Sequence, residues 1–392
     1  MTNWDAFDFN LKFQADALRE HLISIEAYRL SLNRLHLPKE WKTDLQKLYI
    51  VRAVHGTTAI EGNPLSEQEV SRQLARGPGN GRRDQLHRQT ENAAAAFRWV
   101  EEHFDTPRPF LLPDILTIHK IITTGSDEHE NDPGRLRASG HHVTVGSRPL
   151  GGVHHPPPGG EVTKRLVGRF LEFVNSRMFK EQHIVVQALV AHFYFVTLHP
   201  FGNGNGRATR CIEAAILYSG GYNTYGFYSL SNYFYRNRDD YSRLLQETRT
   251  KHRYDLTAFL RFGLTGFREE LERINSYVRN RLHRLQYRDL IRRASDKRVG
   301  KRRRLLNHRE AQLLHGILDA SEPSDPFSNE PAKEATGADL ERLILSLYEA
   351  KTKRTILREL ARLGKMGFIS VIADGPMRNW RYLLRFEAIE QY

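Results

Sequence analysis

The chain has 392 residues, 40% of them hydrophobic and 27% charged, a composition that is typical of a folded protein and excludes general disorder. The N-terminus lacks the basic and apolar regions of a signal peptide, and no apolar run approaches the roughly 18–20 residues of a membrane span. Cys211 is the single cysteine, so no internal disulfide can form. We therefore expect a soluble cytoplasmic protein with two or three domains.

The net charge of +13 is concentrated in one segment. Basic residues far outnumber acidic ones over residues 273–309, and the rest of the chain is close to neutral. We expect a basic linker helix over residues 271–306, which is either simply solvated or in contact with a phosphate backbone.

Helical periodicity predicts an N-terminal helical region over residues 1–105. The helices are expected from about residue 18 to 35, over 42–60, after a capping box formed by Ser66 and Glu69, and over 85–104.

A core of helices with one short β-hairpin is predicted over residues 106–270. Helical patterns cover 115–122, 161–175, 207–218 and 236–267. Glycines and prolines interrupt them over 139–160, where a short strand pair or flap is expected. The apolar run 184–198 has strand propensity in its second half, but its length favours a buried helix. The fold class is therefore mainly α.

The most informative stretch is HPFGNGNGRATR, residues 199–210. Its glycines let backbone N–H groups converge on an anion, and the helix expected from Asn205 directs its N-terminus to the same place. Arg207 and Arg210 share one helix face and can both reach a polyphosphate. His199 can accept a proton near neutral pH. A phosphate-binding loop is favoured over a basic helix–helix turn, although the stretch is neither a P-loop nor a dinucleotide fingerprint.

This stretch resembles the signature of the Fic family, H-P-F-x-[D/E]-G-N-G-R-x-x-R, at every fixed position but one. The likeness extends over about residues 40–265 and includes GRLR, VTVG and HHPPP in the flap region. It supports the helical interpretation of 184–198. It implies a protein adenylyltransferase, which uses ATP and Mg²⁺ to transfer AMP to a Ser, Thr or Tyr hydroxyl of a target protein or of itself.

The resemblance also implies roles for individual residues. His199 would be the general base, and Arg207 and Arg210 would contact the β- and γ-phosphates. Val145 and Gly146 would pair with the target segment as an added strand. The expected ATP-binding residues are Gly202, Asn203, Gly204, Asn205, Gly206, Arg207 and Arg210.

Asn203 departs from the family pattern, which has Asp or Glu at this position to hold Mg²⁺. An amide oxygen can bind the metal but brings no negative charge. Three outcomes are open: weaker metal affinity, a metal held mainly by the phosphates of ATP, or reduced activity. We expect retained activity with a higher Mg²⁺ requirement.

The segment TTAIEGN, residues 57–63, ends a helical pattern, with Gly62 as the left-handed residue that closes the helix. It also resembles the inhibitory motif of the family, [S/T]-x-x-x-E-[G/N]. In that case Glu61 would enter the active site, pair with Arg210 and compete with the γ-phosphate of ATP. The two interpretations are compatible, and we expect autoinhibition.

Other polar residues are expected to be structural. The pairs His141/His142 and His154/His155 lack partners at the spacing of a zinc site, so a loop role is favoured. His192 and Cys211 are expected to be buried helix residues.

Residues 307–392 are predicted to form a winged helix-turn-helix-like domain, with three helices and two strands around an insertion at 321–337. The candidate DNA contacts lie on one face of the third helix: Arg354, Arg358 and Arg362. DNA contact is favoured over docking of a protein. The alternative function is therefore a DNA-binding transcriptional regulator whose Fic site is weak or only self-modifying. A homodimer is compatible with either function.

Overall fold

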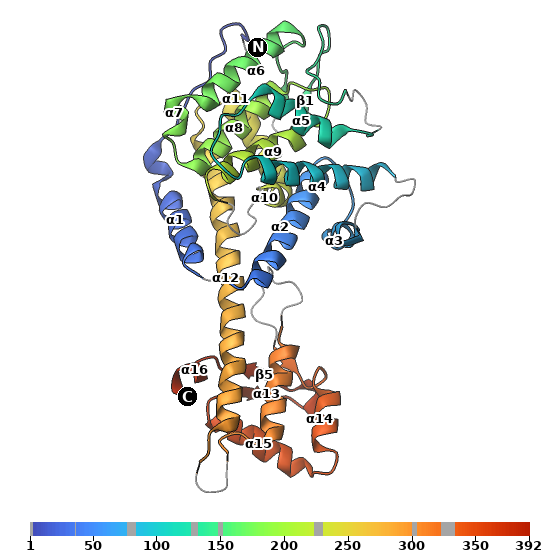
Figure 1. Ribbon diagram of the computed structural model, residues 1–392, viewed down its shortest axis with the longest axis vertical. Helices are drawn as coiled ribbons and strands as arrows, with labels where there is room; N and C mark the ends of the chain where they lie inside the picture. The colour runs from blue at the N-terminus through green and yellow to red at the C-terminus, as the bar shows by residue number, and fades with distance from the viewer. Residues whose placement is uncertain are drawn as a thin grey trace. The chain divides into compact units, whose positions relative to one another are not determined.

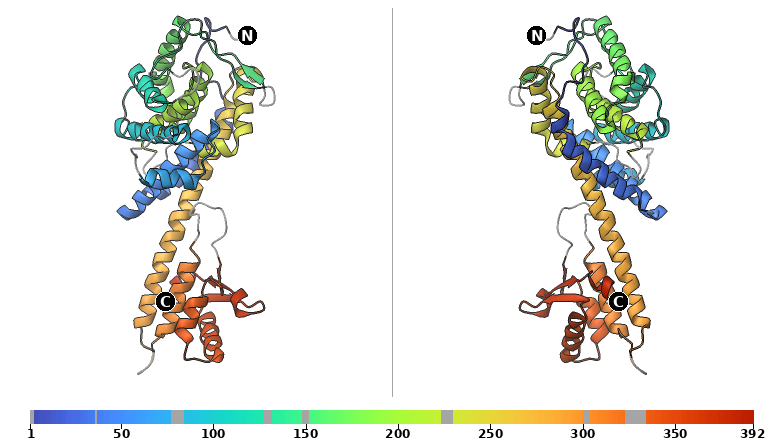
Figure 2. Two further views of the ribbon diagram at one scale, coloured as in Figure 1. Left: turned by 90° about the vertical axis from the view of Figure 1, so that its right-hand side faces the viewer. Right: turned by 90° about the vertical axis from the view of Figure 1, so that its left-hand side faces the viewer.

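The computed structural model describes residues 3–35, 37–76, 84–126, 132–147, 152–222, 230–299, 304–322 and 334–392. The chain divides into two compact units, Met1–Leu271 and Glu272–Tyr392 (Figures 1 and 2). Among the described residues, no helix is both long enough and apolar enough to cross a membrane.

The first unit is built mainly from helices, and the predicted mainly α fold is confirmed. Its one described sheet is the hairpin of β1 (Val145–Ser147) and β2 (Gly152–His154), which run antiparallel. The helices are α1 (Arg19–Asn33), α2 (Lys39–Ile60), α3 (Glu67–Arg76), α4 (Gln85–His103), α5 (Leu112–Thr123), α6 (Glu161–Asn175), α7 (Arg177–Lys180), α8 (Ile184–Leu198), α9 (Asn205–Ser219), α10 (Ser231–Arg236), α11 (Arg238–Thr250) and the first turns of α12 (Thr257–Asp296).

Helix α8 lies at the centre of this unit, and the helical interpretation of its apolar run is confirmed. All of its residues after Ile184 are buried, and it packs against α9 and α6 (Figure 1). A segment that is apolar on every side is stable only when surrounded by other elements, which explains why strand propensity did not decide its conformation.

Helix α2 ends as the sequence predicts. Gly62 adopts a left-handed φ of 95°, and the N–H of Asn63 donates to the carbonyl of Thr58 at 3.1 Å. The capping box at the start of α3 is also present, since Ser66 N donates to Glu69 Oε2 at 2.8 Å.

Gly56 lets α2 approach the backbone of α10 closely. A Cβ atom at this position would lie 2.5 Å from the backbone nitrogen of Asn232. We expect Gly56→Ala to lower the free energy of unfolding by about 1–3 kcal/mol, because the two backbones must move apart. Gly168, in α6, is the matched control, since a Cβ there meets nothing within 4 Å. Gly168→Ala should be neutral or stabilising, and equal thermal midpoints for the two variants would contradict the packing argument.

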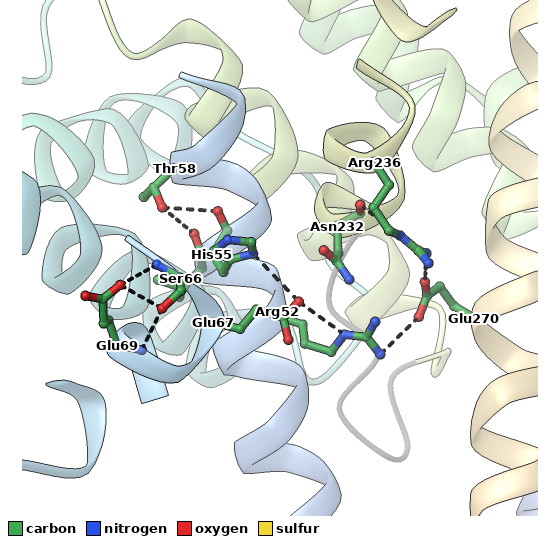
Figure 3. Close-up of polar contacts among 10 residues, drawn as sticks. Arg52, His55, Thr58, Ser66, Glu67, Glu69, Asn232, Arg236 and Glu270 are labelled. Carbon is green, nitrogen blue, oxygen red and sulfur yellow. Dashed lines mark hydrogen bonds and ion pairs between the residues drawn. The ribbon is translucent and has the colours of Figure 1, made fainter. Parts of the chain in front are cut away.

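A polar junction around Arg52 also holds α2 in place (Figure 3). Arg52 Nη1 lies 3.8 Å from Glu270 Oε2 of α12, and Arg52 Nε lies 3.9 Å from Glu67 Oε1 of α3. With its amide oxygen turned toward the guanidinium, Asn232 of α10 accepts from Arg52 Nη2 at 2.9 Å and from Nε at 3.1 Å. Glu270 also accepts from Arg236 Nη2 at 2.5 Å. The helix that carries Glu61 at its end is thus fixed to three other helices.

The prediction of one continuous helical stretch over 236–267 is wrong, because the structure has two helices there. α11 ends at Thr250, and α12 begins only at Thr257. Arg253 and Tyr254 both have positive φ values, 48° and 61°, which an α-helix cannot contain. The basic helix α12 ends at Asp296, and residues 300–303 of the basic segment lie outside the described residues.

The second unit combines helices with a three-stranded antiparallel sheet in the order β3-β5-β4. Its elements are the remainder of α12, α13 (His308–Ala320), β3 (Ala335–Thr336), α14 (Glu341–Tyr348), α15 (Lys353–Lys365), β4 (Ile369–Ile372), β5 (Arg381–Leu384) and α16 (Ala388–Gln391). The three helices and two longer strands follow the predicted order. Strand β3 was not predicted, because it is two residues long and lies at the end of the insertion.

Candidate active site

The glycine-rich loop joins the buried helix α8 to the start of α9. His199 leaves α8 in a left-handed conformation, with φ 46° and ψ 57°, and Gly204 turns the chain again at φ 72°. Phe201 is fully buried beneath the loop and stacks on His119 with ring centroids 3.6 Å apart. The loop is therefore a short, rigid connection between two packed helices.

His119 of α5 supports this loop, a role that no motif in the sequence predicts. Its Nε2–H donates to the carbonyl of Asn203 at 2.9 Å, and its Nδ1 accepts from Gly134 N at 3.0 Å. These partners fix the neutral tautomer of the ring. The signal in the sequence was weak, since it consists of one histidine among the apolar residues of a short helix.

The side chain of Asn205 shapes the loop from within. Its Oδ1 accepts from Phe201 N at 2.9 Å, and its Nδ2 donates to Phe201 O at 2.8 Å. It is 2% exposed and holds the backbone of the loop, and its expected part in ATP binding stays a prediction. The start of α9 at Asn205 still presents first-turn N–H groups and the positive end of the helix dipole.

Two arginines of α9 are buried beside this helix start. Arg207 is 2% exposed and Arg210 is 1% exposed. Arg210 donates from Nε to Thr57 Oγ1 at 2.7 Å and from Nη2 to Thr57 O at 3.1 Å. Buried guanidinium groups are costly unless anions or acceptors balance them, so this end of α9 is a strong anion-binding environment.

Glu61 occupies this environment, and its expected contact with Arg210 is present. Its Oε1 lies 2.7 Å from Arg210 Nη2. A Cβ atom at Gly206 would lie 2.3 Å from the same oxygen, so the carboxylate rests directly on the first turn of α9. Desolvation acts to raise the pKa of Glu61, but the charges of Arg210 and Arg207 outweigh it and the pKa is lowered. The side chain of Glu61 remains 36% exposed, so a ligand that approaches from solvent can displace it from Arg210.

His199 is neutral at physiological pH. Burial, together with the positive charges of Arg137 and Arg249, lowers its pKa to about 4. Arg137 also donates from Nε to the carbonyl of His199 at 2.9 Å, and it binds the carbonyls of His141 and Pro157. A neutral imidazole beside an anion-binding helix start can accept a proton from a hydroxyl group.

The predicted flap is present as the hairpin of β1 and β2. Val145 is paired with His154, and Gly146 with Val153. Gly146 is needed there, because a Cβ would lie 2.7 Å from the carbonyl oxygen of Gly152. The tip of the hairpin, residues 148–151, lies outside the described residues.

The environment of Asn203 does not fit a Mg²⁺ ligand. Its Oδ1 accepts from Gly204 N at 2.6 Å and from Arg207 Nη2 at 3.3 Å. An oxygen that faces two donors, one of them a cation, is poorly placed to bind a second cation. Across the described ranges, no three His, Cys, Asp or Glu side chains are grouped as a metal site would require.

The structural roles expected for two buried residues are confirmed. His192 lies between Glu213 Oε2, at 2.7 Å, and the hydroxyl of Tyr241, at 2.9 Å. Cys211 is buried, and burial raises its pKa to about 12, so it is a neutral thiol.

The three candidate DNA contacts do not share one exposed face. Arg354 and Arg358 of α15 are exposed. Arg362 instead lies 2.6 Å from the fully buried Glu310 and donates to the carbonyl of Leu305. The expectation for Arg362 is therefore corrected, since periodicity alone did not reveal its buried partner.

A family model described as "Fic/DOC family" matches residues 109–217. The curated relatives include proteins named "Protein adenylyltransferase Fic". The protein from Aedes aegypti is 28% identical over 209 residues, which are 53% of this chain and 38% of the relative. The protein from Drosophila willistoni is 26% identical over 202 residues, which are 51% of this chain and 38% of the relative. The chain thus spans well under half the length of these relatives.

Solved structures share the fold. A Fic family protein from Desulfovibrio desulfuricans G20 matches with a TM-score of 0.57 and 18% identity, over 96% of this chain and 98% of the other. Fic-1 (residues 134–508) from C. elegans matches with a TM-score of 0.51 and 23% identity, over 65% of this chain and 71% of the other.

Proposed function

Since the chain contains a Fic domain, we propose that it transfers AMP from ATP to a Ser, Thr or Tyr hydroxyl of a target protein and of itself. The observation that carries the proposal is the neutral His199 beside a helix start flanked by two buried arginines. Each group that this transfer needs, a base and an anion site, is then supplied by one loop and one helix.

In the proposed reaction the target hydroxyl oxygen attacks the α-phosphorus of ATP. His199 takes the hydroxyl proton, a new oxygen–phosphorus bond forms, and the bond to the bridging α,β-oxygen breaks. Pyrophosphate leaves with its charge balanced by Arg207 and Arg210, which stabilises the transition state electrostatically. The target segment would pair with the flap at Val145 and Gly146, which places its hydroxyl beside the base.

We propose further that Glu61 holds the protein in a resting state. Its carboxylate rests on the first turn of α9 and binds Arg210, where the γ-phosphate of ATP would lie. The Arg52 junction and the close approach at Gly56 keep α2 in this position. ATP would then bind productively only after Glu61 is displaced.

Purified protein incubated with ATP labelled at the α-phosphate tests the proposed function. Label should appear on the protein itself, whereas ATP labelled at the γ-phosphate should leave none, which distinguishes AMP transfer from phosphorylation. If neither the wild type nor a Glu61→Gly variant transfers label, the proposal is wrong and the alternative of a DNA-binding regulator gains support.

Because Asn203 does not fit a metal site, we propose that any Mg²⁺ is carried mainly by the phosphates of ATP. Asn203→Asp should lower the Mg²⁺ concentration needed for half-maximal transfer, since a carboxylate adds the charged oxygen that this metal prefers. A Mg²⁺ titration of transfer rates measures the effect. Asn203→Ala is the control and should not lower the requirement. Superimposable curves for Asn203→Asp and the wild type would show that position 203 does not contact the metal.

A further inference from the structure

Arg249 is a buried cation near His199 to which the sequence motifs assign no role. It lies on α11, is 9% exposed, and donates from Nε to Thr197 Oγ1 at 3.0 Å. Its Nη2 is buried without a hydrogen-bond partner among the described residues. Burial lowers its pKa to about 10, so the group stays protonated at neutral pH. A charge that is buried with so few partners destabilises the fold and calls for an explanation.

Thr197 is the point at which Arg249 acts on the candidate active site. Thr197 lies in the last turn of α8, two residues before His199. Its hydroxyl oxygen accepts from Arg249, and its carbonyl accepts from Nε2–H of His154 at 2.8 Å. His154 is the last residue of strand β2. One threonine therefore connects α11, the turn that carries His199, and the end of the flap.

Helix α11 also contacts the same strand directly. Gln246, one helical turn before Arg249, donates from Nε2 to the carbonyl of Val153 at 3.1 Å. The flap is thus fixed at two neighbouring residues, at Val153 by Gln246 of α11 and at His154 by Thr197 of α8, directly beside the proposed docking strand β1.

We propose that Arg249 is a positioning residue of the transfer site, which fixes through Thr197 both the turn that presents His199 and the end of the flap. This proposal rests on the proposed roles of His199 and the flap. It explains why α11 carries a charged side chain into the interior instead of an apolar one.

The charge of Arg249 acts on the same two histidines. Burial is the main cause of the low pKa of His154, about 3, and Arg249 is the next cause. For His199, burial acts first, Arg137 and Arg249 lower the pKa further, and Glu61 opposes them. Arg249 thus helps to keep the base unprotonated, as proton transfer from a hydroxyl requires.

The test measures the pKa of His199 by NMR in protein with labelled histidine, titrated from about pH 3 to 8 so that the range includes the wild-type value. In Arg249→Met, which keeps most of the side-chain volume, the pKa of His199 should rise by about one pH unit because a nearby charge is lost. In Arg249→Lys, which keeps the charge, the pKa of His199 should rise by much less. An unchanged pKa of His199 in folded Arg249→Met would overturn the proposal.

Substitutions of Thr197 provide a second test that leaves the charge in place. Thr197→Val removes the hydrogen-bond acceptor of Arg249. In a Glu61→Gly background it should lower the maximal rate of self-modification about tenfold and leave the Kd for ATP unchanged. Thr197→Ser keeps the hydroxyl and should retain the rate. Equal rates for the two variants would contradict a positioning role.

The titration of His199 separates this proposal from the proposed function. The histidine titration requires no transfer reaction, so it decides the effect of Arg249 on His199 even in an inactive protein. A Glu61→Gly protein that transfers no AMP, with the expected pKa shift in Arg249→Met, would refute the proposed reaction but leave the electrostatic link intact.

Discussion

Glu61→Gly is expected to raise AMP transfer, including self-modification, by at least about tenfold. The substitution removes the carboxylate that lies 2.7 Å from Arg210 Nη2 and rests on Gly206. Hydrogen bonds to charged groups contribute about 1.5–3 kcal/mol net. A factor of ten corresponds to about 1.4 kcal/mol, so the loss of one such contact accounts for the expected increase.

Two further variants show whether the increase acts through Arg210. Glu61→Gln keeps the size of the side chain but removes its charge, so its activity should lie between those of the wild type and Glu61→Gly. The double variant Glu61→Gly/Arg210→Ala should return to low activity, because the freed arginine is what ATP would use. Transfer of α-phosphate label provides the measurement. A single variant no more active than the wild type, or a double variant as active as the single one, would leave Glu61 as an ordinary helix-end residue.

His199→Ala should abolish transfer while leaving ATP binding nearly intact. A general base acts on the incoming hydroxyl and contributes about 10²–10⁴-fold to the rate, so a loss of at least about a hundredfold is expected in the Glu61→Gly background. The Kd for ATP, measured by calorimetry, should change by less than about twofold, since the imidazole does not carry the phosphate charge.

The pH dependence provides an independent check on His199. Because its pKa is lowered to about 4, the imidazole is unprotonated throughout the neutral range, and transfer should be nearly independent of pH between 6 and 8. The rate should fall as the pH drops toward 4 and the base becomes protonated. Transfer at the rate of the parent protein in His199→Ala, or a rate that halves near pH 6.5, would contradict the assignment.

The sequence predicted what depends on local chemistry. Gly62 determines the C-terminus of α2, and the Ser66–Glu69 capping box determines the N-terminus of α3. Each capping motif lies within a few consecutive residues. The length and apolar composition of 184–198 identified the buried helix α8. The motif at 199–210 located the loop and its two arginines because its glycines and charged residues lie close together in the sequence.

The sequence could not predict which polar groups bind one another across the fold. Asn203 and Asn205 are amides two residues apart in the same motif, yet Asn205 binds the backbone of Phe201 and Asn203 faces Arg207. Arg362 has the spacing of an exposed helix residue but binds Glu310, 52 residues away. Partners of this kind are set by the tertiary packing of separate elements, which a local periodicity does not contain.

Cys211 has a practical consequence for spectroscopic work on this protein. It is the single cysteine of the chain, it is 1% exposed, and its raised pKa keeps it in the unreactive thiol form. We therefore expect the unmodified protein to react little with thiol-directed labels. A cysteine introduced at Val153, which is 39% exposed on the flap, would be the dominant reactive site and could carry a fluorophore that reports when a target segment docks.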